Sequence, residues 1–446
     1  MPLRLLRHPL GDGYSAPAVF AALHGDDTDV FWLDSGTSGT AYLGAGERWY
    51  PPSPVLDAVR AELAGPDPEA DAGAPAFRLG LVGWLGYELR GETMGAEVSR
   101  VSRYPDAAFL RVTRAVAIEP DGSAELLALG PTWDDHAGWR DEVTQRLRAV
   151  HGVADVVARE ARAGDSGGPL RVRWHESDAE YLASIAACQD AIREGEAYQL
   201  CLTTEARVDG VIDPVATYRR VRELSPSHHG ALLRIGGVSL LSASPERFLE
   251  VHPDGIVRTH PIKGTRRRDP DAASDARLRD ELLASDKERA ENIMIVDLMR
   301  NDLARVSEPG SVVVPSLLDV ESYPQVHQLV SSIEGRLRGG LDGVDAIAAC
   351  LPAGSMTGAP KRRATEILDR LERRARGLYA GAFGYLGRDG RIDLAMTIRS
   401  IVIDEHGATL GTGGGITALS VPEEELAEAR LKAAALLGAL GVATLE

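Results

Sequence analysis

The sequence contains only four lysines among its 49 basic residues: Lys263, Lys287, Lys361 and Lys432. A buried lysine amine can lose its proton and become a nucleophile, whereas a guanidinium cannot. A chain that otherwise uses arginine is therefore expected to keep lysine where an amine is needed. Lys263 is the strongest candidate, because the proline and glycine of Pro261-Ile-Lys-Gly-Thr265 shape the backbone around it. The alternative is that codon bias alone makes lysine rare, and that Lys287 is an ordinary solvated helix residue.

Cysteine is equally scarce. Cys188, Cys201 and Cys350 lie in apolar contexts without CxxC spacing, which argues against a disulfide framework and a zinc site. The N-terminus lacks the apolar stretch of a secretion signal, and no apolar run is long enough to span a bilayer. We therefore expect three core thiols and a cytoplasmic protein.

Positive charge is in deficit, with 49 basic against 66 acidic residues and a formal net charge of −17. The average field would repel nucleic acid and anionic membrane surfaces, so we expect neither as a partner. An anionic substrate must instead meet a local cluster of arginine, lysine or metal. With 446 residues and 44% hydrophobic composition, the chain can form one large domain or two.

A stretch from about Ala158 to Gly168 predicts a flexible linker. Before it, short apolar or alternating stretches predict strands near 30–33 and 110–118. After it, Ser177 caps a helical pattern that runs to about Glu194. Further strands are predicted at 198–202, 232–235, 239–244 and 392–398, and long helices near 275–303, 360–375 and 422–440. Hairpin-like turns such as 387–390 indicate an α+β fold with much antiparallel sheet.

Two pairs of carboxylates have helical spacing. Glu288 and Glu291 are three residues apart and share a helix face, as do Glu425 and Glu428. Four carboxylates on two helices could bind one Mg²⁺, which prefers oxygen ligands and takes one or two direct carboxylates. Lys432 follows on the same face and could reach a ligand anion or these carboxylates. The alternative is a solvated acidic face.

Six motifs follow one another in a specific order. They are Ser244–Leu249, Pro261–Thr265, Glu291 with Val296–Asp302, Gly354–Lys361, Asp393–Arg399, and Gly413–Gly415 followed by Glu425, Glu428 and Lys432. In this order they resemble the motifs of the chorismate-utilising enzymes, most closely the synthase component of the aminodeoxychorismate synthase branch. The resemblance is strong from about Asp178 to Ala434.

The resemblance implies an α+β fold of large mixed, mainly antiparallel β-sheets packed as a sandwich with helices outside, as in anthranilate synthase component I. It also implies two parts, an N-terminal subdomain over 1–165 and a chorismate-binding catalytic domain over 166–446. The resemblance is looser before the linker, where Trp32-Leu-Asp-Ser35 is similar to a remnant of a tryptophan-binding element.

Position 263 distinguishes the branches of the family. Relatives that form anthranilate, isochorismate or salicylate usually carry alanine there, whereas lysine is typical of aminodeoxychorismate synthases. Lys263 therefore implies amination at C4 by a transaminase-type transferase. Gln199 supports this, because relatives that add water place a lysine base at that position and a glutamine cannot take the proton.

The resemblance implies a covalent reaction. Lys263, as its neutral amine, would attack C2 of chorismate as the C4 hydroxyl leaves, and Glu246 would protonate that hydroxyl. Ammonia would then enter at C4 and expel Lys263. We expect an apolar neighbour such as Phe248, or a neighbouring anion, to raise the pKa of Glu246, and burial with an adjacent ammonia channel to favour the neutral Lys263 amine.

The resemblance also implies a metal site and a substrate site. Glu291 and Glu428 would bind Mg²⁺ directly, while Glu288 and Glu425 would act through waters. The implied substrate-binding residues are Tyr379, Arg399, Gly413, Gly414, Gly415, Lys432, Ser355 and Thr265.

Several of these residues have simpler alternatives. Glu246 could form a structural salt bridge with Arg247. Lys361, near a helix start, could face a ligand or partner, or could only pack. The polar residues of 297–302 are expected to be structural.

No cysteine lies in the Gly-x-Cys-x-Gly turn of a glutaminase nucleophile. We therefore expect a separate glutamine amidotransferase subunit to supply ammonia, and a product that serves folate or other aminoaromatic biosynthesis. One alternative is an anthranilate synthase component I, which Lys263 argues against. Another is a non-catalytic regulatory subunit that binds chorismate or tryptophan, which the intact Glu246, Lys263, Glu291 and Glu428 argue against.

Overall fold

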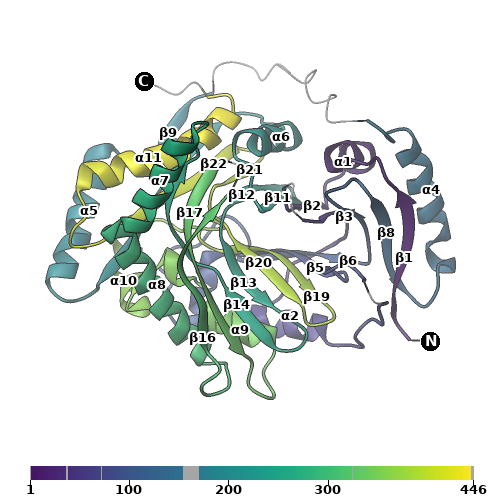
Figure 1. The fold of residues 1–446 in the computed structure, drawn as a ribbon, viewed down its shortest axis with the longest axis horizontal. Coiled ribbons are helices and arrows are strands. Elements are labelled where there is room, and N and C mark those ends of the chain that lie inside the picture. Colours follow the sequence, from purple (N-terminus) through teal and green to yellow (C-terminus); the bar gives the residue numbers. More distant parts are fainter. Residues whose placement is uncertain (1, 37–38, 72, 154–169, 324, 443–446) are drawn as a thin grey trace.

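The computed structural model contains two large antiparallel sheets with helices on their outer faces (Figure 1). It describes residues 2–36, 39–71, 73–153, 170–323 and 325–442. The first sheet has twelve strands: β1 (Arg4–Gly11), β8 (Ala124–Gly130), β7 (Arg114–Ile118), β3 (Ala41–Ala45), β2 (Val30–Asp34), β11 (His229–Ile235), β12 (Val238–Ser244), β21 (Ser400–Asp404), β22 (Gly407–Ile416), β10 (Gln199–Asp209), β18 (Gly358–Ala359), and β9 (Val172–Trp174) beside β10. The second has ten: β15 (Ile262–Arg267), β17 (Val326–Arg336), β14 (Ile256–Thr259), β13 (Arg247–Val251), β20 (Ile392–Met396), β19 (Ala382–Gly387), β5 (Gly80–Leu85), β6 (Ala107–Val112), β4 (Glu47–Trp49), and β16 (Val313–Ser322) beside β17.

The α-helices of the described residues lie outside the two sheets. They are α1 (Ala16–His24), α2 (Val55–Leu63), α3 (Arg90–Met94), α4 (Ala137–Arg148), α5 (Asp178–Arg193), α6 (Pro214–Leu224), α7 (Ala272–Ala284), α8 (Asp286–Ala304), α9 (Gly343–Cys350), α10 (Lys361–Glu372) and α11 (Pro422–Ala439). Figure 1 shows α5, α7, α8, α10 and α11 gathered on the side away from the N-terminus.

Three large apolar clusters hold these layers together, and two smaller ones pack α5 and α10 on β10 and α7 on β16 and β17. Between the sheets, Phe31 and Leu233 of the first sheet share a core with Trp84 and Phe383 of the second. The outer face of the first sheet packs against α1, α4, α6 and α11, and the outer face of the second packs against α2, α8 and α9. Each sheet is therefore buried on both faces, and the predicted α+β sandwich with helices outside is confirmed.

Both sheets combine strands from the beginning and the end of the chain. In the first sheet β2 pairs with β11, and in the second β5 pairs with β19. The predicted linker, 158–168, lies outside the described residues. The division into 1–165 and 166–446 stays a prediction, as does the tryptophan-pocket remnant, where Trp32 is a buried core side chain stacked on Phe20.

Local sequence signals predicted several elements well and misjudged others. Ser177 caps α5 through a capping box with Glu180, as its spacing predicts. The single helix expected over 275–303 is two helices, because Ser285 is extended and caps the start of α8. The stretch 110–118 likewise divides between β6 and β7. No helix among the described residues has the length and apolarity needed to cross a lipid bilayer.

Candidate functional site

Lys263 lies in β15, and its side chain is only 15% exposed. Its Nζ lies 3.9 Å from Glu291 Oε2 on α8. A Cβ atom built on Gly415 of β22 would lie 3.6 Å from that Nζ and 2.1 Å from Gln199 Nε2. The structure therefore brings together residues from β10, β15, β22 and α8. With Glu246, described next, we call Lys263, Gln199, Glu291 and Gly415 the lysine cluster.

The pKa of Lys263 differs from the sequence-based expectation. Burial lowers this pKa, as predicted, but Glu291, Cys201, Glu246 and Glu288 together raise it above its ordinary value. The expected net lowering of this pKa is not seen, because several nearby anions, distant in sequence, outweigh the effect of burial.

Glu246 lies between β12 and β13 and is 6% exposed. Burial raises its pKa to about 7, while a hydrogen bond from Ser355 and the charge of Lys263 act in the opposite direction. The Ser355 hydroxyl donates to Glu246 Oε1 at 2.8 Å. Arg247 pairs with Glu250 and Asp393, so the alternative Glu246–Arg247 salt bridge is not formed. The raised pKa follows the prediction for a proton donor, with Phe248 buried in the core.

The four candidate metal carboxylates lie on α8 and α11, each beside a cationic side chain. Arg266 lies 3.8 Å from Glu288, and Lys263 lies 3.9 Å from Glu291. Lys287 lies 3.2 Å from Glu425, and Lys432 lies 2.6 Å from Glu428. One of these ion pairs joins the two helices, since Lys287 of α8 donates a hydrogen bond to Glu425 of α11. Lys287 is exposed on α8, as expected of a solvated helix residue, and it also pairs with a buried carboxylate.

These carboxylates do not form a ready-made metal cluster. Within the described ranges, no three His, Cys, Asp or Glu side chains converge closely enough to hold a metal ion. The like charges repel one another and pair with basic side chains instead. The donors still suit Mg²⁺, which needs only one or two carboxylates and keeps several waters. The basic groups beside all four carboxylates show that this region favours a positive charge.

Tyr379 and Arg399 lie beside the glycines of β22. A Cβ atom on Gly411 would lie 2.2 Å from the Tyr379 ring, so glycine is required for this contact. Arg399 has a positive φ of 50°, a strained conformation for a non-glycine residue. The pKa of Arg399 is lowered overall, because the effect of burial exceeds the opposite effect of Tyr379 and Glu428. Such strain at a half-buried arginine is typical of a ligand site.

The remaining candidate residues divide into two groups. Lys432 Nζ donates to the Gly413 carbonyl at 2.9 Å, and a Cβ atom on Gly414 would approach Glu425 to 3.0 Å. Lys432, Gly413 and Gly414 thus adjoin the carboxylates of α11. Thr265, by contrast, is exposed on β15. Ser355 contacts Glu246, so the structure places it beside the proposed acid.

The surroundings of two side chains, Gln199 and Lys361, could not be predicted from the local sequence. Gln199 is 1% exposed, and neither its amide nitrogen nor its amide oxygen has a hydrogen-bond partner. Lys361 forms a buried ion pair with Asp302 and donates to the Cys350 carbonyl at 3.1 Å. In this structure Lys361 therefore packs against other groups of the protein, which is one of the two alternatives given above. The pairing partner of Lys361 is distant in sequence, so no local pattern shows it.

Comparisons with known proteins agree with this arrangement. The profile of the family described as chorismate binding enzyme matches residues 31–438. An aminodeoxychorismate synthase of Streptomyces pristinaespiralis is 39% identical, covering 95% of this chain and 63% of that protein. Anthranilate synthase component 1 of Haloferax volcanii is 36% identical, covering 96% of this chain and 82% of that protein. The structure of anthranilate synthase component I from Streptococcus pneumoniae TIGR4 has a TM-score of 0.74 and 27% identity, covering 98% of this chain and 92% of that one.

The chain spans less than two thirds of the length of the Streptomyces relative. Its matched region includes the lysine cluster and all four carboxylates of α8 and α11. The predicted resemblance to chorismate-utilising enzymes, and to aminodeoxychorismate synthases among them, is confirmed by these matches. The chain belongs to the chorismate binding enzyme family.

Proposed function

We propose that this protein converts chorismate and ammonia into 4-amino-4-deoxychorismate. The observation that carries the proposal is the placement of Lys263 in the lysine cluster, where it and Glu246 influence each other's pKa. A buried lysine beside a carboxyl group whose pKa is about 7 supplies a nucleophile and an acid in one place. The Streptomyces relative, named an aminodeoxychorismate synthase, supports this choice.

In the proposed reaction, the Lys263 ammonium gives a proton to water, and the neutral amine then attacks C2 of chorismate. The ring double bond shifts, the C4–O bond breaks, and neutral Glu246 donates a proton so that the hydroxyl leaves as water. Ammonia then attacks C4, the double bond shifts back, and the C2–N bond to Lys263 breaks. The amine recovers its electron pair, and the ammonia nitrogen passes its extra proton to the Glu246 carboxylate, which becomes neutral again.

The substrate has two carboxylates, of which one is assigned to basic side chains and the other to Mg²⁺. Arg399, with Tyr379 beside it, would bind one carboxylate-bearing end, together with the main chain of Gly413–Gly415. Lys432, adjacent to Gly413, would add positive charge at the same end. Ser355 would act chiefly by orienting Glu246, and Thr265 would contact substrate only at the exposed side of β15.

Glu291 and Glu428 would hold Mg²⁺ directly, with Glu288 and Glu425 acting through waters. When bound, the ion supplies positive charge that holds a substrate carboxylate and offsets the carboxylates that raise the Lys263 pKa. Lys287 and Lys432 must release Glu425 and Glu428, at least in part, for these roles. The half-exposed Glu428 side chain can move more freely than Glu425, which is 3% exposed.

Ammonia would come from a glutamine amidotransferase partner. The three cysteines of this chain are buried, and burial raises the pKa of each thiol, so none is suited to act as a glutaminase nucleophile. The folate or aminoaromatic destination of the product and a cytoplasmic location remain part of the same proposal.

The second candidate is anthranilate formation, which the Haloferax relative's name favours. One assay separates the two. The chain is incubated with chorismate, MgCl₂ and ammonium chloride, and the products are identified by mass spectrometry. Retention of the substrate's enolpyruvyl group together with a new amine supports the proposal. An aromatic aminobenzoate with release of pyruvate would show anthranilate formation, and unchanged chorismate would support a non-catalytic subunit.

A further inference from the structure

Asn292 is a buried polar residue on the face of α8 that packs against the second sheet. It is 0% exposed, and it continues a stripe of buried apolar side chains formed by Ile295, Val296, Met299 and Leu303. An apolar side chain at this position would complete the stripe. A buried carboxamide is costly there unless both of its polar atoms have hydrogen-bond partners.

Both polar atoms of the Asn292 side chain are hydrogen-bonded to β17. Its Nδ2 donates to the Leu329 carbonyl at 3.3 Å, and its Oδ1 accepts from the Ser331 hydroxyl at 2.6 Å. The Ser331 hydroxyl also accepts from the main-chain N–H of Leu318 on β16 at 2.9 Å. Leu318 has a φ of 59°, which is strained for leucine, so this bond stabilises an irregular point of β16. We call these contacts the Asn292–Ser331 network.

The Asn292–Ser331 network adjoins both members of the Lys263–Glu291 pair. On α8, Asn292 directly follows Glu291. On the sheet, the main-chain N–H of Ser331 donates at 3.2 Å to the carbonyl of Pro261, two residues before Lys263. The network therefore connects the chain segment that carries the carboxylate with the segment that carries the amine.

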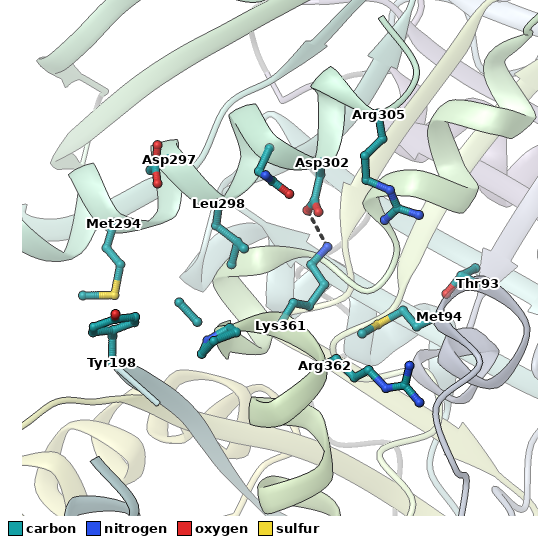
Figure 2. A pocket seen from close by; sticks show the side chains of 13 residues that line it. Thr93, Met94, Tyr198, Met294, Asp297, Leu298, Asp302, Arg305, Lys361 and Arg362 are labelled. Carbon is teal, nitrogen blue, oxygen red and sulfur yellow. Dashed lines mark hydrogen bonds and ion pairs between the residues drawn. The ribbon is translucent and has the colours of Figure 1, made fainter. Parts of the chain in front are cut away.

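Another face of α8 is less closely packed, because it borders a pocket of about 560 Å³ (Figure 2). Figure 2 shows Met294 and Leu298 of α8 around this pocket with Lys361 of α10. On the β17 side, the apolar packing is non-directional and does not by itself fix the helix along its axis. Hydrogen bonds depend on distance and angle, so those of Asn292 can set this position.

We propose that Asn292 and Ser331 are positioning residues, which hold α8 in one register on β17 and thereby keep the Glu291 carboxylate beside Lys263. The inference rests on the proposed function, in which these two groups are a metal ligand and the nucleophile. Without the network, Glu291 would shift relative to Lys263. Both Mg²⁺ binding and the attack on chorismate would then be weakened.

The scarcity of lysine allows the contact between Lys263 and Glu291 to be observed directly by NMR. Protein labelled with ¹³C at lysine Cε should give four lysine signals, and the signal of Lys263 is assigned by its loss in Lys263→Arg. Asn292→Leu keeps a side chain of similar size and removes both hydrogen bonds. Ser331→Ala is a second variant that removes one of them. Val296→Ala is the matched control, because Val296 is 5% exposed on the same stripe and its truncation weakens packing without breaking the network.

In Asn292→Leu and in Ser331→Ala, the Lys263 signal should move towards its position in Glu291→Gln, whereas in Val296→Ala it should stay in place. Adding Asn292→Leu to Glu291→Gln should cause no further movement, because the carboxylate through which Asn292 acts is already gone. The Mg²⁺ dissociation constant of Asn292→Leu should rise roughly tenfold, and adduct formation on Lys263 should slow by a similar factor. Circular dichroism checks that each variant is folded.

An unchanged Lys263 signal with unchanged Mg²⁺ affinity in the folded variants would overturn the inference. Equal changes in Val296→Ala would overturn it too, since the network would then only stabilise the fold. Loss of the folded state in both network variants would likewise show a purely structural role. Failure of the proposed function is seen separately, because the parent would then form neither adduct nor 4-amino product while its Lys263 signal still reports the contact with Glu291.

Discussion

Lys263 Nζ lies 3.9 Å from Glu291 Oε2, so the proposed nucleophile and a proposed metal ligand share one buried ion pair. The surrounding anions outweigh burial and raise the pKa of the amine. A positive ion at Glu291 and a bound substrate would change this balance. Under the proposed metal assignment, the pair would link metal binding to the reactivity of the amine.

Lys263→Arg should be about as damaging as Lys263→Ala, with 4-amino product reduced by at least about a thousandfold. Arginine keeps the charge but has no accessible neutral form. In Lys263→Ala, ammonia could attack C2 directly, and the remaining product should shift towards 2-amino species. Rapid quench and intact mass analysis should reveal a chorismate adduct on the parent only. Near-parent rates in Lys263→Arg would contradict the covalent mechanism.

Glu291→Gln and Glu428→Gln should abolish turnover and weaken Mg²⁺ binding measured by titration calorimetry, because an amide is a poor ligand for a hard dication. Glu424→Gln is the matched control, since Glu424 is exposed on the same helix as Glu428. Circular dichroism should show an intact fold in all three variants. Full parent activity in excess chelator would contradict the metal assignment.

Glu246→Gln should lower kcat by about 10²–10⁴-fold, the usual contribution of a positioned acid. The substitution should also change how the free energy of unfolding depends on pH. Burial raises the pKa of Glu246 in the folded protein to about 7. The contribution of this group to stability is therefore lost as the pH rises from its pKa in the unfolded chain towards 7. At pH 8 the variant should be more stable than the parent by about 3 kcal/mol, and at pH 5 by less than about 1 kcal/mol. Denaturant unfolding at both pH values measures this; a difference independent of pH would contradict the raised pKa.

The isolated chain should use ammonium salts at high pH, where ammonia is neutral, and should not use glutamine. Adding a glutamine amidotransferase subunit should create glutamine-dependent activity. The reason is the burial of Cys188, Cys201 and Cys350. Glutamine turnover by the pure chain that persists after all three cysteines are replaced would contradict this prediction.

Lys361→Met should destabilise the fold by about 3–5 kcal/mol, because Asp302 would remain buried without its partner. The double variant Lys361→Met with Asp302→Asn should regain much of that loss, since the unpaired charge is gone. Denaturant unfolding of the single and double variants measures both effects. A single variant as stable as the parent would show that the pair is not structural.

Local patterns in the sequence predicted the parts of this site but not their partners. Helical spacing placed Glu288 with Glu291 and Glu425 with Glu428 on common faces, and the structure has them there. The ion pairs that these groups form, such as Lys287 with Glu425, join residues that are far apart in sequence. The direction of the Lys263 pKa depends on these long-range contacts, so it could not be obtained from the motif around Lys263.

The rarity of lysine marked four positions, and the structure pairs each of these four lysines with a carboxylate.

Local signals were also insufficient to predict the whole fold. Strand and turn signals predicted antiparallel sheet, as at the 387–390 turn between β19 and β20. They could not show that β2 pairs with β11 or β5 with β19, because strand pairing across such distances leaves no local signal.

The pairings β2–β11 and β5–β19 have a consequence for a chain cut once within 154–169. Each fragment alone would present unpaired strand edges, which favour aggregation. Together, the fragments could recombine, because two hydrogen-bonded ladders and the core between the sheets would hold them. A nick there would leave one molecule in two pieces, and the protein would suit fragment complementation with the break placed at that point.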